Sequence, residues 1–364
     1  MSEECGPIQC KIGSDIIPMT SQKTYAGITF THNLQSSSSI FDACVKGRTN
    51  LNSLLSIGIH PNGLNPVLSF NIIKSVVYSS MLYGCELWNS YTKQAVEELE
   101  RTQRYACRRC IGLPKTSSTA VTAQCLGSFD MWSEVERRKL LFWNKLCLGG
   151  PKFLWKTLFI IRLCQFMYGS SSTTQIGFLP DIYNIMVKFN IESFINDYVL
   201  NIFVPPMLCW KRFINRFIYD FYYIRWTDKL NTRDEHKRYA AIHSDPGINP
   251  ILQLSTKQIS QQHVWDLVEL FKYSISCENE LVICKICEKT SKDIVLHFIL
   301  ECPGLYLSRD KMMDGVVNAI EVLSYVQFSE LSIEDQCSFL LGDHSHVYLT
   351  GNIKGMVCEM ESFL

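Results

Sequence analysis

Hydrophobic residues recur at helical spacing along most of the chain, so the pattern predicts a mainly α-helical protein. The first part differs, because residues 8–12 alternate as in a short strand and residues 23–31 (KTYAGITFT) form a second β-rich run. We expect these segments to form a small β hairpin or the remnant of a sheet. From Ser39 the spacing becomes helical, and the loop at 60–66 separates a first helix from a second at about 67–82.

Residues 93–111 carry the clearest amphipathic pattern in the chain. Leu99 and Cys107 lie near one face of the expected helix, and charged side chains populate the rest of its surface. The acidic residues fall early and the basic residues late, which suits the helix dipole. The sequence therefore predicts a helix here, which Gly112 ends, and another at about 131–147.

The Gly-Gly-Pro run at 149–151 indicates a boundary, beyond which the pattern stays mostly helical. Residues 207–238 fit one long helix or two shorter ones. Phe213, Phe217 and Phe221 follow one another at intervals of four, so we expect this stripe to face a core. An exposed stripe would instead stack on nucleic-acid bases. Two more helices are expected near the end of the chain, at 309–326 and 333–341.

The composition is that of a folded protein without net charge. Hydrophobic residues make up 47 % of the 364 residues, which allows two or three packed domains. The 35 basic and 35 acidic residues cancel, so nucleic-acid binding would require a local basic patch. The most apolar stretch, 153–169, is interrupted by Lys156 and Arg162, and a charge near the bilayer centre costs about 2.5–3.5 kcal/mol. We therefore expect a packed helix there and no membrane contact.

The 16 cysteines are scattered along the chain rather than arranged as a disulfide framework. The first residues, MSEECGPIQCK, are polar and acidic and carry no signal peptide. We therefore expect a protein of the nucleus or the cytoplasm that is not secreted, and whose thiols stay reduced. Reduced thiols remain able to bind a metal ion.

Cys284, Cys287, His297 and Cys302 form the most informative group of residues in the chain. Three thiols and an imidazole are the soft ligands that a tetrahedral zinc ion takes, and four protein ligands leave no open position for catalysis. The alternative is coincidence in a cysteine-rich chain, and Cys277 is a possible substitute ligand. Because His297 and Cys302 lie five positions apart, a helix that carries both must end or bend near Cys302.

Basic residues gather near two of the expected elements. Arg101, Arg104 and Arg108 share one face of the helix at 93–111, at i, i+3 and i+7. One interpretation of this face is that it is solvated and that its arginines pair with nearby glutamates. The other is that it contacts the phosphates of a nucleic acid. The candidate nucleic-acid contacts are Arg101, Arg104, Arg108, Arg109, Lys115, Lys285 and Arg309.

Three stretches taken together resemble the segment after the polymerase palm in non-LTR (LINE-type) retrotransposon reverse transcriptases. They are KTYAGITFTHNL, SSMLYGCELWNS and ELERTQRYACRRCIGLPKTSS, in this order along the chain. Members of that family often end in a Cys-Cys-His-Cys knuckle. In this sequence His297-Phe298 and Cys302-Pro303 resemble the second half of that knuckle. The resemblance covers about residues 8–148 and 277–312, and Ala26 departs from it because the family favours leucine there.

The resemblance implies a helical thumb that lies along a nucleic-acid duplex and a zinc knuckle that holds RNA or target DNA. The family's polymerase uses palm aspartates, including an Asp-Asp pair, to hold two divalent metal ions. This sequence contains no Asp-Asp pair. We therefore expect the palm to be missing, and a protein that is not an enzyme, with no catalytic residues and no small-molecule substrate.

The resulting expectation is a non-catalytic, zinc-containing nucleic-acid-binding protein. Its partner would be RNA, DNA or both, bound largely without regard to sequence, and its oligomeric state stays open. The alternative is a structural zinc protein that acts as an interaction partner or scaffold. The expected segments are a β remnant at 1–35, a thumb-like helical domain at 36–148, a helical connector at 149–275, the knuckle at 276–312 and C-terminal helices at 313–364.

Overall fold

Helices dominate the protein, as the hydrophobic pattern predicted, and strands occur as short antiparallel pairs in the part that the structure describes. The structure is a computed structural model. It describes residues 11–13, 15–16, 20–60, 63–115, 117–169, 177–232, 239–240, 243, 247–249, 252–253, 268, 271–272, 282–320 and 322–341. No helix among these residues is both long enough and apolar enough to cross a membrane.

Contacts along the chain divide it into two compact units. Unit 1 comprises Met1–Gly47, Ser79–Glu100 and Glu134–Phe217. Unit 2 comprises Arg48–Tyr78, Arg101–Ser133 and Ile218–Leu364. The five segments expected from the sequence stay a prediction.

The described residues of the N-terminal segment form two β hairpins. The first pairs β1 (Lys11–Ile12) with β2 (Asp15–Ile16), and the second pairs β3 (Gln22–Tyr25) with β4 (Ile28–Thr31). The run KTYAGITFT therefore folds back on itself. Ala26 and Gly27 both adopt positive φ values, 48° and 77°, which is the backbone of the two-residue turn that suits the twist of a hairpin.

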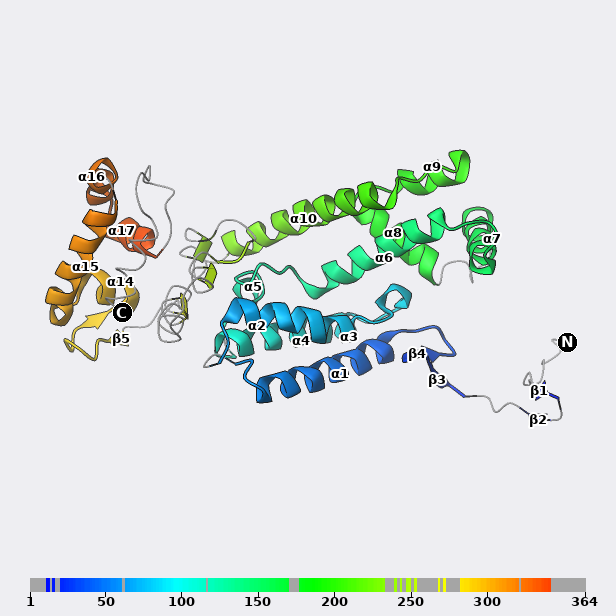
Figure 1. Cartoon of the computed structure of the whole chain (residues 1–364), viewed down its shortest axis with the longest axis horizontal. Coiled ribbons are helices and arrows are strands. Elements are labelled where there is room, and N and C mark those ends of the chain that lie inside the picture. The colour runs from blue at the N-terminus through cyan, green and yellow to red at the C-terminus, as the bar shows by residue number, and fades with distance from the viewer. Residues whose placement is uncertain are drawn as a thin grey trace. The chain divides into compact units, whose positions relative to one another are not determined.

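The helices of the first part follow the predicted pattern closely, and the predicted helices at 93–111 and 131–147 are confirmed (Figure 1). The one predicted at about 67–82 contains a π-helical turn, Lys74–Tyr78, between two α-helical pieces. Asn65 begins it by accepting a hydrogen bond from the Val67 backbone N–H at 2.9 Å. The helices are α1 (Ser37–Ser56), α2 (Pro66–Ile73), α3 (Ser79–Met81), α4 (Lys93–Ile111), α5 (Thr119–Thr122) and α6 (Met131–Leu148), with a 3-10 turn at Cys85–Leu87.

A second run of helices continues the chain (Figure 1). It consists of α7 (Leu154–Tyr168), α8 (Phe178–Lys188), α9 (Ser193–Asn201) and α10 (Met207–Asn231). Unit 1 is held together by aromatic residues of α6 and α10, since the ring centroids of Trp143 and Trp210 lie 5.3 Å apart. Trp210 also donates its indole N–H to the Leu140 backbone oxygen at 2.9 Å.

The stripe that α10 buries differs from the predicted one. Phe213, Phe217 and Phe221 are only half-buried, so the prediction that they form the core-facing stripe was wrong in register. Phe213 and Phe217 contact each other at the edge of the buried face, with ring centroids 4.4 Å apart. The buried stripe repeats every four residues along a neighbouring line of the same helix and consists of Trp210, Ile214, Ile218, Tyr222, Trp226 and Leu230.

The C-terminal part begins with a hairpin of β5 (Val282–Ile283) and β6 (Thr290–Ser291). The predicted helix at 309–326 is divided in two, because Ile320 adopts an extended backbone and buries its side chain. Phe328 and Phe339 pack together beyond it, with ring centroids 5.0 Å apart. The helical elements are α14 (Ile294–Leu296), a π-helical turn (His297–Glu301), a 3-10 turn (Pro303–Leu305), α15 (Tyr306–Ala319), α16 (Val322–Glu330) and α17 (Ile333–Leu340).

Candidate metal centre

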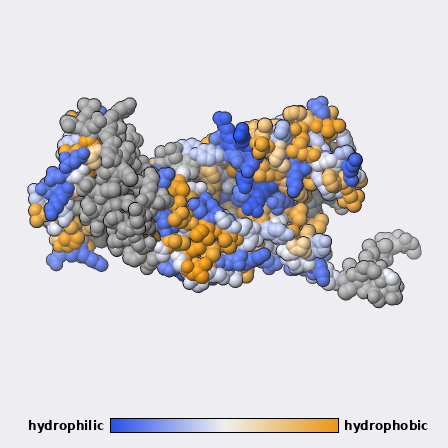
Figure 2. Space-filling view, viewed as in Figure 1, coloured by the Kyte–Doolittle hydropathy of each residue, from blue (hydrophilic) through white to orange (hydrophobic). Residues whose placement is uncertain are grey.

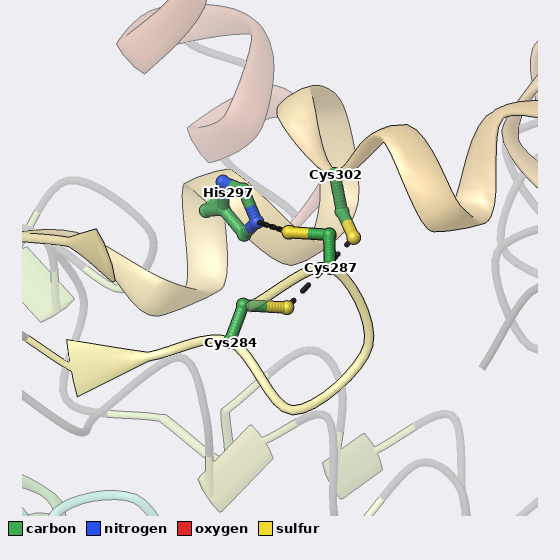
Figure 3. A group of neighbouring side chains, drawn as sticks. All are labelled: Cys284, Cys287, His297 and Cys302. Carbon is green, nitrogen blue, oxygen red and sulfur yellow. Dashed lines mark hydrogen bonds between the residues drawn. The ribbon is translucent and has the colours of Figure 1, made fainter. Parts of the chain in front are cut away.

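Three short elements bring the four predicted metal ligands to one place (Figure 3). Cys284 follows β5, and the turn after it carries Cys287. This turn closes when the Glu288 backbone N–H donates to the Cys284 oxygen at 2.8 Å. His297 and Cys302 come from the opposite side, at the start and just beyond the end of the π-helical turn.

The π-helical turn explains how His297 and Cys302 can meet. Asp293 starts the preceding helix by accepting hydrogen bonds from the Val295 and Leu296 N–H groups at 3.1 and 3.0 Å. The Cys302 N–H then donates to the His297 oxygen, the i to i+5 bond that defines a π turn. This wider turn brings residues five apart closer to one face than an α-helix would. The predicted helix end is confirmed, because Cys302 has an extended backbone with ψ 116°.

The geometry of the four side chains fits a tetrahedral metal ion. Their ligand atoms all lie within 4.8 Å of one another. Cys284 Sγ lies 3.8 Å from Cys302 Sγ, and Cys287 Sγ lies 3.2 Å from His297 Nε2. Four atoms placed about 2.3 Å from a common zinc ion at tetrahedral angles lie about 3.8 Å apart. The three cysteines are free thiols, so all four ligands are available to one ion.

The local electrostatics prepare part of the cluster for a cation. Backbone N–H groups of Cys287 and Ile286 point at Cys284 Sγ and lower the pKa of that thiol to about 6. Burial raises the pKa of the Cys302 thiol, and the neighbouring sulfurs of Cys287 and Cys284 raise it further. Thiolates are the form that binds metal, and several of them close together repel one another until a cation joins them.

A carboxylate that the sequence analysis did not single out stands behind the imidazole. His297 is buried, and its Nδ1 lies 3.7 Å from Glu301 Oε2. In metal-binding histidines, the ring nitrogen that does not bind the metal usually donates a hydrogen bond to such a carboxylate. This hydrogen bond fixes the orientation of the ring. The spacing of His297 and Glu301, one helical turn, was the signal in the sequence that could have found this residue.

Arg309 lies next to the cluster but is engaged with the backbone. Its Nε donates to the Ile299 oxygen at 3.0 Å, and its Nη2 donates to the Cys302 oxygen. Both carbonyls lie at the end of the π-helical turn, and the Cys302 oxygen also accepts from the Leu305 backbone N–H at 3.2 Å. Arg309 thus stabilises the backbone that presents Cys302, and two of its donors are already in use.

The lysines around the cluster are the more accessible cations. Lys285, Lys289 and Lys292 are all exposed. Among the residues that the structure describes, none of the three forms an ion pair within 4.0 Å. Lys285 follows Cys284 directly, so its ammonium group comes from the metal-binding turn itself. Glu288 and Glu301 are also exposed on this segment, so they offset the positive charge of the three lysines in part.

The predicted basic face of α4 divides into exposed and engaged residues. Arg101 and Arg109 are exposed, and so is Lys115 in the loop after the helix. Arg104 and Arg108 are half-buried. Arg108 Nη2 donates to the Ser117 oxygen at 2.8 Å, and burial together with the nearby Arg104 lowers the pKa of Arg108.

The structure thus brings the four predicted metal ligands together, while the nucleic-acid contacts stay a prediction. Comparison of the chain with protein-family models, with curated proteins and with solved structures gave no match. The assignment of the metal centre therefore depends on the donor set and its geometry. With four protein ligands and no vacant position, the centre can stabilise a fold but cannot activate a water molecule.

Proposed function

We propose that this protein binds nucleic acid without catalysing a reaction, and that a zinc ion closes the 282–309 segment that makes part of the contact. One observation carries the proposal. Four ligand atoms converge within 4.8 Å on a short segment whose exposed residues include three lysines. We call this segment the metal module.

Zinc is the metal that suits the donor set. Soft thiolates select zinc, copper(I) or iron–sulfur clusters, and one imidazole with three thiolates is a common structural zinc site. The segment around the ligands has two-residue strands and short helical turns, so it has little regular structure of its own to hold it. A metal ion supplies the missing stabilisation, since binding free energy in such modules is folding free energy.

The distribution of charge supports nucleic acid as the partner. The whole chain is neutral, so attraction to phosphates must come from local groups. Lys285, Lys289 and Lys292 provide such a group on the metal module, and Arg109 and Lys115 provide exposed charge at the end of α4. Lysine and arginine contacts of this kind read the phosphate backbone rather than the base sequence.

The resemblance to non-LTR retrotransposon reverse transcriptases also supports nucleic-acid binding. Two of its three motifs contact each other in unit 1, because Ile28 of the hairpin lies against Gly84 of the LYGCELW segment. The third motif forms α4, whose apolar face is buried around Leu99 and Cys107. We propose that the chain corresponds to the part that follows the polymerase palm, and that it does not polymerise.

The salt dependence of binding tests the nucleic-acid proposal. We would measure the affinity for fluorescent RNA and DNA oligonucleotides, single-stranded and duplex, over a range of salt concentrations. Replacing Lys285, Lys289 and Lys292 together by alanine should make the slope of log K against log salt shallower by about two to three units. Lys311→Ala removes an exposed charge from α15 and is the matched control. A slope that the triple variant leaves unchanged would contradict the proposal.

A scaffold protein with a structural zinc ion is the second candidate. Exposed apolar side chains on the metal module favour it, namely Ile283, Ile286, Tyr306 and Leu307. Such residues are typical of protein interfaces. Binding to oligonucleotides that ignores both salt and the three lysines would favour this second function over the first.

A further inference from the structure

Unit 1 contains a cavity that the proposed function does not use. Its volume is about 440 Å³, and it lies between α7, α9 and the end of α6. Its walls are mostly apolar, with Ile160, Leu163 and Met167 on α7 and Val199 on α9. A space of this size and character is typical of a site for a small ligand.

One charged side chain, Lys156, lines the cavity. Lys156 is only 6 % exposed, and its ammonium group donates to the backbone oxygens of Leu146 and Cys147 at 3.0 and 2.6 Å. These are free carbonyls in the last turn of α6, so Lys156 stabilises that helix end. No carboxylate lies within 4.0 Å of its Nζ among the described residues, and the cavity lining contains no acidic residue. The rings of Phe159 and Tyr198 also face the ammonium group, with centroids 5.4 and 5.0 Å from Nζ. Hydrogen bonds and rings compensate a buried charge in part, but they do not neutralise it as a carboxylate would.

The third hydrogen bond of Lys156 goes to Tyr198 and leaves the Tyr198 hydroxyl proton able to bind a ligand. Its Nζ lies 2.5 Å from the hydroxyl oxygen of Tyr198, which also lines the cavity and is 7 % exposed. Because that oxygen accepts from the ammonium group, the Tyr198 hydroxyl proton is left to donate elsewhere. The described residues offer it no acceptor. Burial raises the pKa of Tyr198 to about 12, so the hydroxyl keeps its proton at neutral pH.

The helix that forms one wall, α7, buries a charged side chain and exposes several apolar ones. Lys156 points inward from α7, whereas Leu158 and Ile161 are among its exposed residues. Hydrophobic side chains reach the surface over α7 and α9 (Figure 2). At the end of α9, Ile202 is 80 % exposed and has a φ of 53°, a left-handed backbone that β-branched residues avoid. Strain of this kind gathers at ligand sites.

We propose that this cavity binds an amphiphile made of a slender apolar chain and a terminal carboxylate. The chain would lie along Ile160, Leu163, Met167 and Val199. The carboxylate would accept the free hydrogen bond of Tyr198 and bring the missing negative charge next to Lys156. The inference is independent of the nucleic-acid proposal, because every residue of the cavity belongs to unit 1 and the metal module belongs to unit 2.

Two native cysteines allow a direct test on the full chain. Cys164 and Cys209 are both exposed, but only Cys164 lines the cavity. With dodecanoate as the probe at ten times its Kd, modification of Cys164 by a maleimide should slow about tenfold, because only the unliganded protein reacts. The rate at Cys209 should not change. Equal slowing at both cysteines, or none at Cys164, would overturn the proposal.

The head group and the site are tested by controls. Dodecyltrimethylammonium has the same chain and the opposite charge, so it should protect Cys164 far less than dodecanoate does. Ile160→Trp should block the cavity, whereas Ile161→Trp, one residue along the same helix and outside the lining, should not.

Tyr198→Phe should weaken dodecanoate protection, and Tyr183→Phe should leave it unchanged. Equal protection by both amphiphiles, or full protection in Ile160→Trp, would contradict the assignment.

Discussion

The side chain of Ile28 occupies the space beside Gly84 in which any other residue would place its Cβ atom. A Cβ built at Gly84 would lie 2.6 Å from Ile28 Cδ1, which is closer than real Cβ atoms approach other heavy atoms. Gly84 also has a φ of 74°, in the left-handed region that favours glycine. Two demands therefore meet at this position, one from the backbone and one from packing.

Gly84→Ala should destabilise the protein by about 1–3 kcal/mol, since the backbone strain and the displaced Ile28 side chain both contribute. Gly27→Ala is the matched control. It has nearly the same φ, 77°, but its nearest contact would be an ordinary 3.7 Å to Tyr83. Urea denaturation compares the two. Equal losses of stability would mean that Ile28 does not restrict Gly84.

The buried ion pair between Lys139 and Asp181 supports a second prediction. Lys139 is fully buried on α6 and also donates to the Trp88 backbone oxygen. Asp181→Asn removes the carboxylate charge of Asp181 from the buried ammonium group and should cost about 3–5 kcal/mol. Asp130→Asn is the control, because its pair with Lys229 spans 3.4 Å near the surface and should cost less than about 1 kcal/mol. Similar values for both variants in denaturant unfolding would contradict this view.

Glu301 should tune the metal centre although it is not a ligand. Glu301→Gln removes the charge that faces His297 Nδ1 and should weaken zinc binding by about tenfold. The measurement is competition with a chelator of known affinity. Glu288→Gln changes an exposed acidic residue of the same module and should have little effect. If the two variants lose affinity equally, general charge rather than the His297 contact explains the loss.

Substitutions of Arg108 and Arg109 should affect different properties of α4, one its stability and the other nucleic-acid binding. Arg108→Ala removes the hydrogen bond to the Ser117 oxygen and should reduce stability by about 1–2 kcal/mol, with little change in the salt dependence of nucleic-acid binding. Arg109 is exposed, so Arg109→Ala should leave stability within about 0.5 kcal/mol and make the salt slope shallower by about one unit. The reverse assignment of the two effects would contradict this division into an engaged Arg108 and an exposed Arg109.

The sequence could predict those features that depend on residues close together in the chain. The amphipathic pattern of 93–111 and the spacing of Cys284, Cys287, His297 and Cys302 are both local, and the helix and the ligand cluster are where they were expected. The line of α10 residues that faces the core was harder to predict. Aromatic residues occur all around α10, and the line that is buried depends on packing against α6, as in the hydrogen bond from Trp210 to Leu140.

The cavity could not be predicted from the sequence at all. In the sequence, Lys156 is a charged residue that interrupts the apolar stretch at 153–169, and nothing indicates that it lines a cavity. Its burial depends on the Leu146 and Cys147 carbonyls at the end of α6 and on Tyr198 of α9, and neither pattern nor spacing connects these residues. The π-helical turn at His297–Glu301 was missed for a related reason, since the sequence indicated a bend but not its kind.

Native mass spectrometry of protein purified without added metal tests the central claim most directly. The account predicts one zinc ion per chain, lost in Cys287→Ser and retained in Cys209→Ser, which alters an exposed cysteine outside the cluster. A folded protein that carries no metal, or a zinc ion that Cys287→Ser does not remove, would contradict it.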